Sequence, residues 1–136
     1  MILVIHTCDQ STIKLFLVNQ GKIYSKKIFS ARYRQSEKLL PALAIFLQQI
    51  KSPNKLESIG VVTGPGPFTA IRIGISVANT LGWAKKLPVF GLKLSEFNAT
   101  NNLAELIEKK FQLAKRGTIV KPFYGQEPNI TLKNGS

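Results

Sequence analysis

One stretch, residues 61–86, constrains the fold more than any other part of the chain: VVTGPGPFTAIRIGISVANTLGWAKK. It begins as an apolar strand end, passes through a Gly/Pro turn and continues as a helix whose small and apolar residues recur every three or four positions. A short apolar strand follows at residues 88–92 (PVFGL). Strand–helix–strand order favours parallel pairing through a right-handed crossover. The stretch therefore predicts an α/β domain.

The residues before this stretch predict the rest of the sheet. Residues 2–7 form an apolar run typical of a buried central strand, and residues 12–19 and 22–29 alternate on either side of a Gln20-Gly21 turn. These three strands predict an antiparallel meander. We expect a helix at residues 36–51 with Ser36 as its N-cap, and a strand at 56–63.

After residue 100 the pattern predicts a helix at 103–115, stopped by Arg116-Gly117, and a short strand at 118–120. With 136 residues the chain is expected to form one domain. We divide it into a main lobe (1–100), a helix and short strand returning to the same lobe (101–121), and an extended or disordered tail (122–136). The predicted architecture is a mixed sheet, an antiparallel meander continued by parallel strands, with helices packed on it.

The charge is strongly positive, with 19 Lys and Arg against 7 Asp and Glu and a net charge of +12. Such a chain favours polyanionic partners, although a basic soluble surface or an acidic protein partner explains the charge equally well. We find no sequence-specific nucleic-acid motif. No run is long enough to span a membrane, and the N-terminal MILVIHTCDQ does not have the pattern of a signal peptide, so we expect a cytoplasmic protein.

His6, Cys8 and Asp9 are the residues that first suggest chemistry. On a strand His6 and Cys8 share one face and Asp9 lies on the other, and one His with one Cys cannot close a zinc site. We therefore predict no catalytic residue and no metal site, and treat His6 as a partly buried residue at a strand end.

The Gly/Pro turn at residues 64–69 lies where a loop can cradle phosphate. It lacks the Lys-Ser/Thr ending of a P-loop, and its two prolines remove N–H donors. A turn that only defines shape is the favoured interpretation. If the turn does contact an anion or a nucleotide, the candidate residues are Thr7, Gly64, Gly66 and Thr69.

The helix after the turn has small residues four apart, which lets another backbone approach closely. Glycine in a helix costs roughly 0.5–1 kcal/mol relative to alanine, so close packing is expected to compensate. That packing is either on the chain's own sheet or against a partner helix. The candidate interface residues on the two helices are Ser36, Glu37, Leu40, Leu43, Leu47, Ala70, Ile71, Gly74, Ile75, Ala78 and Gly82. On the partner hypothesis, Gly74→Leu or Ala78→Arg should abolish pairing and leave the fold intact.

The segment TGPGPFTAIRIGISVANTLGWAKKLPVFGL resembles the signature region of the TsaB (YeaZ) family. RYRQSEKLLPALAIFL is similar to the family's first helix, and PFYGQEPNIT to its C-terminal tail. The opening strand and meander also fit. The resemblance covers most of the chain.

The resemblance implies a ribonuclease H-like lobe of the ASKHA (actin-like ATPase) superfamily. It implies a non-catalytic protein of tRNA threonylcarbamoyladenosine synthesis that pairs with the catalytic protein TsaD, with the ATPase TsaE joining the complex. ATP and magnesium would be used by the assembled complex rather than by this chain, and tRNA would bind this chain only indirectly, through the complex. In the family this pairing buries the two helices that match residues 36–51 and 68–85.

Two departures from the family pattern matter. The first strand ends in His6-Thr7 where the family has Asp-Thr, which weakens any expectation of nucleotide hydrolysis. Relatives also have a second lobe before the tail, so a two-lobed cleft is not expected here and binding of TsaE is left open.

The sequence thus predicts a single-lobe scaffold that stabilises TsaD through a helix–helix interface, with a homodimer through the same helices as an open question. The alternative from another class is a small nucleotide-binding or ATPase-like enzyme that uses the loop at 64–69. A peptidase, the third hypothesis, has no supporting Ser-His-acid or zinc set.

Overall fold

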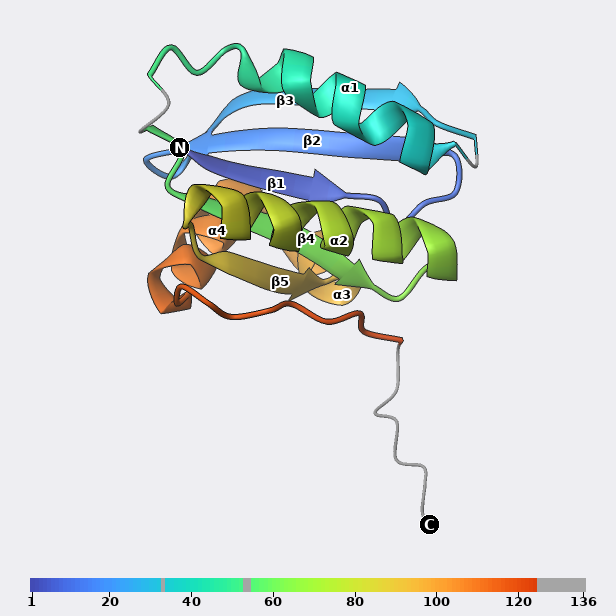
Figure 1. The fold of residues 1–136 in the computed structure, drawn as a ribbon. Helices are drawn as coiled ribbons and strands as arrows, with labels where there is room; N and C mark the ends of the chain where they lie inside the picture. Colours follow the sequence, from blue (N-terminus) through green and yellow to red (C-terminus); the bar gives the residue numbers. More distant parts are fainter. Residues whose placement is uncertain (33, 53–54, 125–136) are drawn as a thin grey trace, which may run out of the picture.

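The computed structural model describes residues 1–32, 34–52 and 55–124, and within them a five-stranded sheet is covered by helices on both faces (Figure 1). The predicted tail lies outside the described residues from 125 onward. The strands are β1 (Ile2–His6), β2 (Thr12–Asn19), β3 (Lys22–Ser30), β4 (Ser58–Gly64) and β5 (Val89–Lys93). The helices are α1 (Gln35–Leu47), α2 (Phe68–Lys85), α3 (Leu94–Ala99) and α4 (Leu103–Leu113).

The strand order is β3-β2-β1-β4-β5, with β1 in the centre. β1, β2 and β3 pair antiparallel, whereas β4 pairs parallel with both β1 and β5. All five residues of β1 are buried, because the strand has neighbours on both sides and helices above and below. The predicted mixed sheet is confirmed.

The two faces of the sheet are covered by different helices. α1 and α2 lie side by side on one face, and α3 and α4 lie behind the sheet in Figure 1. Side chains of β1 alternate, so Leu3 and Ile5 pack toward α2 while Val4 and His6 point to the α3–α4 face. His6 meets the Phe97 ring of α3 edge-on, with ring centroids 4.7 Å apart. None of the helices in the described ranges is long and apolar enough to cross a membrane.

The structure corrects the predicted start and end of the first helix. Ser36 is not the N-cap, because α1 begins at Gln35 after Arg34, which makes no side-chain capping bond. Gln35 is buried instead, and its amide donates hydrogen bonds to the carbonyl oxygens of Asp9 and Gln10. α1 ends at Leu47, four residues before the predicted end. The helix therefore starts where a side chain can hold the β1–β2 loop.

Two predictions after β5 are also corrected. The six-residue helix α3 was not foreseen; its Glu96 carboxylate accepts the Lys93 N–H and forms a 2.7 Å ion pair with Lys110 of α4. Residues 118–120 form no strand. Val120 bonds instead to the side chain of Asn79 on α2, at 3.1 Å and 3.0 Å. The segment after α4 does return to the same lobe, but it is anchored on a helix.

Candidate functional site

The inner face of α2 packs on the chain's own sheet. A Cβ added at Gly74 would lie 2.3 Å from the Thr7 hydroxyl, and one at Gly82 would lie 2.2 Å from the Val89 side chain. The small-residue stripe thus brings α2 close to β1 and β5. Six of the predicted interface residues on α2 are buried within the chain itself, and their role at a partner interface stays a prediction: Ala70, Ile71, Gly74, Ile75, Ala78 and Gly82.

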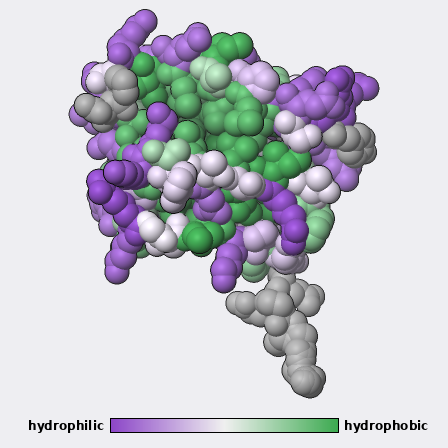
Figure 2. Space-filling view, in the orientation of Figure 1, coloured by the Kyte–Doolittle hydropathy of each residue, from purple (hydrophilic) through white to green (hydrophobic). Residues whose placement is uncertain are grey.

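The outer surface between α1 and α2 is open and apolar. Two adjoining hollows of about 460 and 340 Å³ lie along it. We call this surface the helix-pair groove; its lining residues are Ser36, Leu39, Leu40, Leu43, Phe68, Thr69, Arg72, Ile73, Ser76, Val77, Thr80, Leu81 and Ala84. Figure 2 shows a broad hydrophobic area over these two helices with hydrophilic residues around it.

Several groove residues present large side chains to solvent. Leu40 is 59% exposed and Phe68 is 55% exposed. At one end of the groove the Phe68 ring contacts both the Arg72 guanidinium, 4.1 Å from the ring centroid, and the Tyr124 ring, which stacks on it at 5.5 Å. An apolar groove with a cation–aromatic end is suited to a protein partner that brings an amphipathic helix.

The predicted interface residues of α1 divide between surface and core. Ser36, Glu37 and Leu40 are exposed, Leu47 is half-buried and Leu43 is buried at the base of the groove. Sequence reasoning missed the outer residues of α2, chiefly Ser76, Val77 and Thr80. They could have been found as the positions of α2 that remain once its small residues are assigned to the sheet.

The predicted anion contacts in the Gly/Pro turn are only partly accessible. Thr7 is buried and its hydroxyl donates a 2.7 Å hydrogen bond to the Ala70 carbonyl. Gly64 is buried at φ 123°, and an added Cβ there would lie 2.3 Å from the Phe123 carbonyl oxygen. Gly66 and Thr69 are exposed. Contact of this turn with an anion stays a prediction.

Burial shifts the pKa values of both His6 and Cys8 toward their uncharged forms. Desolvation, assisted by nearby Lys14, lowers the pKa of His6 to about 4, and its Nδ1 accepts the Cys8 N–H at 3.2 Å. Burial raises the pKa of the Cys8 thiol to about 12. At neutral pH the imidazole is therefore uncharged and the sulfur is protonated, which suits a core rather than a nucleophile. Among the described residues no three His, Cys, Asp or Glu side chains are grouped as a metal site requires.

Comparisons with known proteins agree with this fold. The family model described as "TsaD: tRNA N6-adenosine threonylcarbamoyltransferase" matches residues 29–113. A Bacillus subtilis protein named "tRNA threonylcarbamoyladenosine biosynthesis protein TsaB" is 29% identical over 83% of this chain and 50% of its own length. The protein of the same name from Buchnera aphidicola (subsp. Schizaphis graminum) is 27% identical over 76% of this chain and 52% of its own.

Among solved structures, YeaZ from Pseudomonas aeruginosa superposes with a TM-score of 0.59 at 24% identity. The match covers 68% of this chain and 42% of YeaZ. The chain therefore has the ribonuclease H-like fold, and it spans about half the length of the curated relatives it matches. By its family-model match and by these relatives, the chain belongs to the TsaD family of threonylcarbamoyladenosine proteins, on its TsaB (YeaZ) branch.

Proposed function

We propose that this chain is a non-catalytic scaffold in the synthesis of threonylcarbamoyladenosine at position 37 of tRNA, and that it binds and stabilises the catalytic subunit TsaD. The observation that carries the proposal is the helix-pair groove, an open apolar surface on two helices held rigidly by the sheet. The names of the TsaB relatives support the pathway, and the match to the TsaD family model supports a related fold in the partner.

The groove supplies the binding energy that such a role needs. Burying an exposed Leu or Phe side chain contributes about 1.5–3 kcal/mol, so Leu40 and Phe68 together offer a substantial anchor. An added helix would pack along α1 and α2, with its ridges of side chains in the groove between them. Glu37 and Arg72 at the margins would then set its orientation through charge rather than affinity.

The proposal assigns no catalytic step to this chain. With His6 uncharged and Cys8 protonated at neutral pH, neither has the form of an activated nucleophile. ATP and magnesium would be used by the assembled cytoplasmic complex, with TsaE as a further partner and tRNA bound through the assembly. A homodimer through the same groove would compete with TsaD.

The test is co-purification of the chain with TsaD from the same organism, followed by a tRNA modification assay. Leu40→Arg with Ser76→Arg places two like charges in the groove and should weaken pairing at least about a hundredfold, because each charge loses its hydration without gaining a partner. Leu113→Glu is the matched control, since Leu113 is 80% exposed on α4, on the far face of the sheet.

Full pairing by the double variant, or equal loss with the control, would overturn the proposal. Modification that is unchanged when the chain is omitted would overturn the scaffold role. ATP turnover by the isolated chain would instead favour the enzyme that uses the loop at 64–69.

A further inference from the structure

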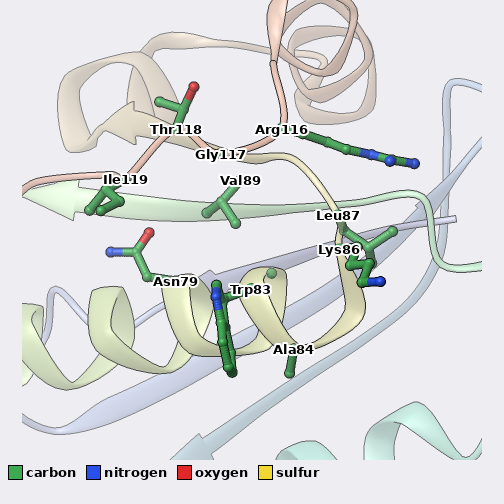
Figure 3. Close-up of a pocket in the computed structure, with 11 residues that line it drawn as sticks. Asn79, Trp83, Ala84, Lys86, Leu87, Val89, Arg116, Gly117, Thr118 and Ile119 are labelled. Carbon is green, nitrogen blue, oxygen red and sulfur yellow. The ribbon is translucent and has the colours of Figure 1, made fainter.

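A cavity of about 610 Å³ opens at the other end of α2, outside the main part of the helix-pair groove (Figure 3). Its walls are the last turns of α2, the Lys86–Val89 connection to β5, and residues 116–119. Its apolar lining includes buried Val89, half-buried Leu87 and exposed Ile119. A volume in this range is typical of sites for small organic ligands or for one residue of a larger one.

The cavity walls are held in place by hydrogen bonds from residues distant in sequence. The Asn79 side chain both accepts the Val120 N–H and donates to the Val120 carbonyl, which fixes the segment next to residues 116–119. The Leu87 N–H donates to the Gly82 carbonyl at 2.8 Å and closes the α2 end of the cavity. The site is therefore preformed, which lowers the cost of ordering it on binding.

The charged side chains among the residues that line the cavity are both cationic. The chain has no Asp or Glu between Glu57 and Glu96, or between Glu108 and Glu127, and both walls of the cavity come from these acid-free segments. Lys86 and Arg116 line the opening and are exposed, and they point to the same side in Figure 3. The ligand should be an anion.

The cavity also has an aromatic platform. Trp83 lines it and is 83% exposed, more than any other large apolar residue in the described part of the chain. Stacking of a base on an aromatic side chain is worth about 1–3 kcal/mol, and every base offers a flat face for it. An aromatic ring beside an apolar hollow, with cations at the opening, matches a base joined to a phosphate.

We propose that this cavity binds one unpaired nucleotide of a single-stranded RNA. The base lies in the apolar hollow beside Trp83, and its phosphate lies between Lys86 and Arg116. We take the nucleotide to belong to an RNA strand rather than to be a free mononucleotide, because exposed Lys85, Lys115 and Lys121 lie close in sequence to the lining residues and supply more positive charge than a single phosphate needs. This site shares only Ala84 with the lining of the helix-pair groove.

The test uses the isolated chain, so its result does not depend on TsaD. Trp83 is the only tryptophan, and its fluorescence therefore reports on this cavity alone. Titration with a single-stranded oligoribonucleotide of roughly eight residues should quench the fluorescence to saturation, whereas AMP and UMP should bind at least about tenfold more weakly.

Variants then locate the site. Lys86→Glu with Arg116→Glu should weaken RNA binding about a hundredfold, and Lys26→Glu with Lys27→Glu on β3, an equal change in charge, should weaken it less than about threefold. Trp83→Ala, followed by the anisotropy of a labelled RNA, should cost about tenfold. The absence of quenching, equal affinity for AMP, or equal loss in the β3 variant would overturn the proposal.

Discussion

The two faces of α2 differ in their environment: one is buried on the sheet and the other is open to solvent. The inner face consists of Ala, Gly and Ile side chains that are buried on the sheet, and it contains Gly74 and Gly82 where β1 and β5 come closest. The outer face has larger side chains that are exposed or half-buried along the helix-pair groove. The comparison teaches that the small residues of α2 lie where the helix touches its own fold, and that the outer face is the one that the proposed partner would contact.

The largest effect is expected from substitutions on the inner face. Gly74→Leu places a side chain in the space of Thr7, and Ala78→Arg buries an unpaired charge. Each should cost more than about 3 kcal/mol, a large part of the stability of a domain of this size. Urea unfolding followed by circular dichroism measures the loss. A Gly74→Leu variant with unchanged stability would show that there is room for a side chain between α2 and Thr7, contrary to the packing described.

A change of pH is expected to alter the stability of the domain, through His6 in the core, without altering binding at the helix-pair groove. The pKa of His6 is about 4 when folded, below its value of 6.5 when unfolded, so the unfolded chain binds the extra proton between these values. Stability should therefore be constant above about pH 6.5 and fall by up to about 3 kcal/mol as the pH drops toward 4. Urea midpoints at several pH values measure this slope.

Two controls sharpen the pH experiment. His6→Leu should remove most of the slope between pH 6.5 and 4. Pairing through the groove should stay constant over the range in which the domain remains folded, because the groove lining contains no Asp, Glu or His. A slope that His6→Leu leaves unchanged would contradict the assignment to His6.

An intermediate effect on stability is expected at Asn79, which lies on α2 between the inner and outer faces and anchors the segment at Val120. Asn79→Ala removes both hydrogen bonds to Val120 and leaves two backbone groups without their partner. The expected loss is about 1–3 kcal/mol, accompanied by faster proteolysis after residue 115. Unchanged cleavage would mean that other contacts hold the segment.

The smallest effect on stability is expected on the outer face. Leu40→Arg and Ser76→Arg lie at exposed positions and should each change the free energy of unfolding by no more than about 0.5 kcal/mol. Differential scanning calorimetry of each single variant measures it. A large loss would show that the groove is part of the core.

Local patterns were enough to predict most of the fold. The period-two alternation of residues 12–19 gave β2 with its observed bounds. The Gly/Pro turn predicted a helix after it, and the bounds 68–85 implied by the family resemblance match those of α2. α3 escaped prediction because six residues are too few for a helical period. The Ser36 cap was wrong because Gln35, one residue earlier, bonds to a loop more than 20 residues away.

The site was harder to predict than the fold for a physical reason. A small-residue stripe is equally suited to a sheet or to a partner helix, and the choice depends on Thr7, which is far from Gly74 in sequence but touches it in the fold. The cavity beside Trp83 likewise depends on the bond between Asn79 and Val120, 41 residues apart. Neither contact is visible in a sequence window.

The sheet has two outer edges, and the protein deals with them differently. The segment of residues 117–124 runs along β5 in Figure 1, with the Phe123 N–H donating to the Thr63 carbonyl. β3 lacks such a cover among the described residues and bears Lys22, Lys26 and Lys27 beside exposed Ile23 and Ile28. A second molecule adding its own β3 there would bring lysines against lysines. Since concentrated salt screens charge within a few ångströms, it would remove this guard against strand-by-strand aggregation.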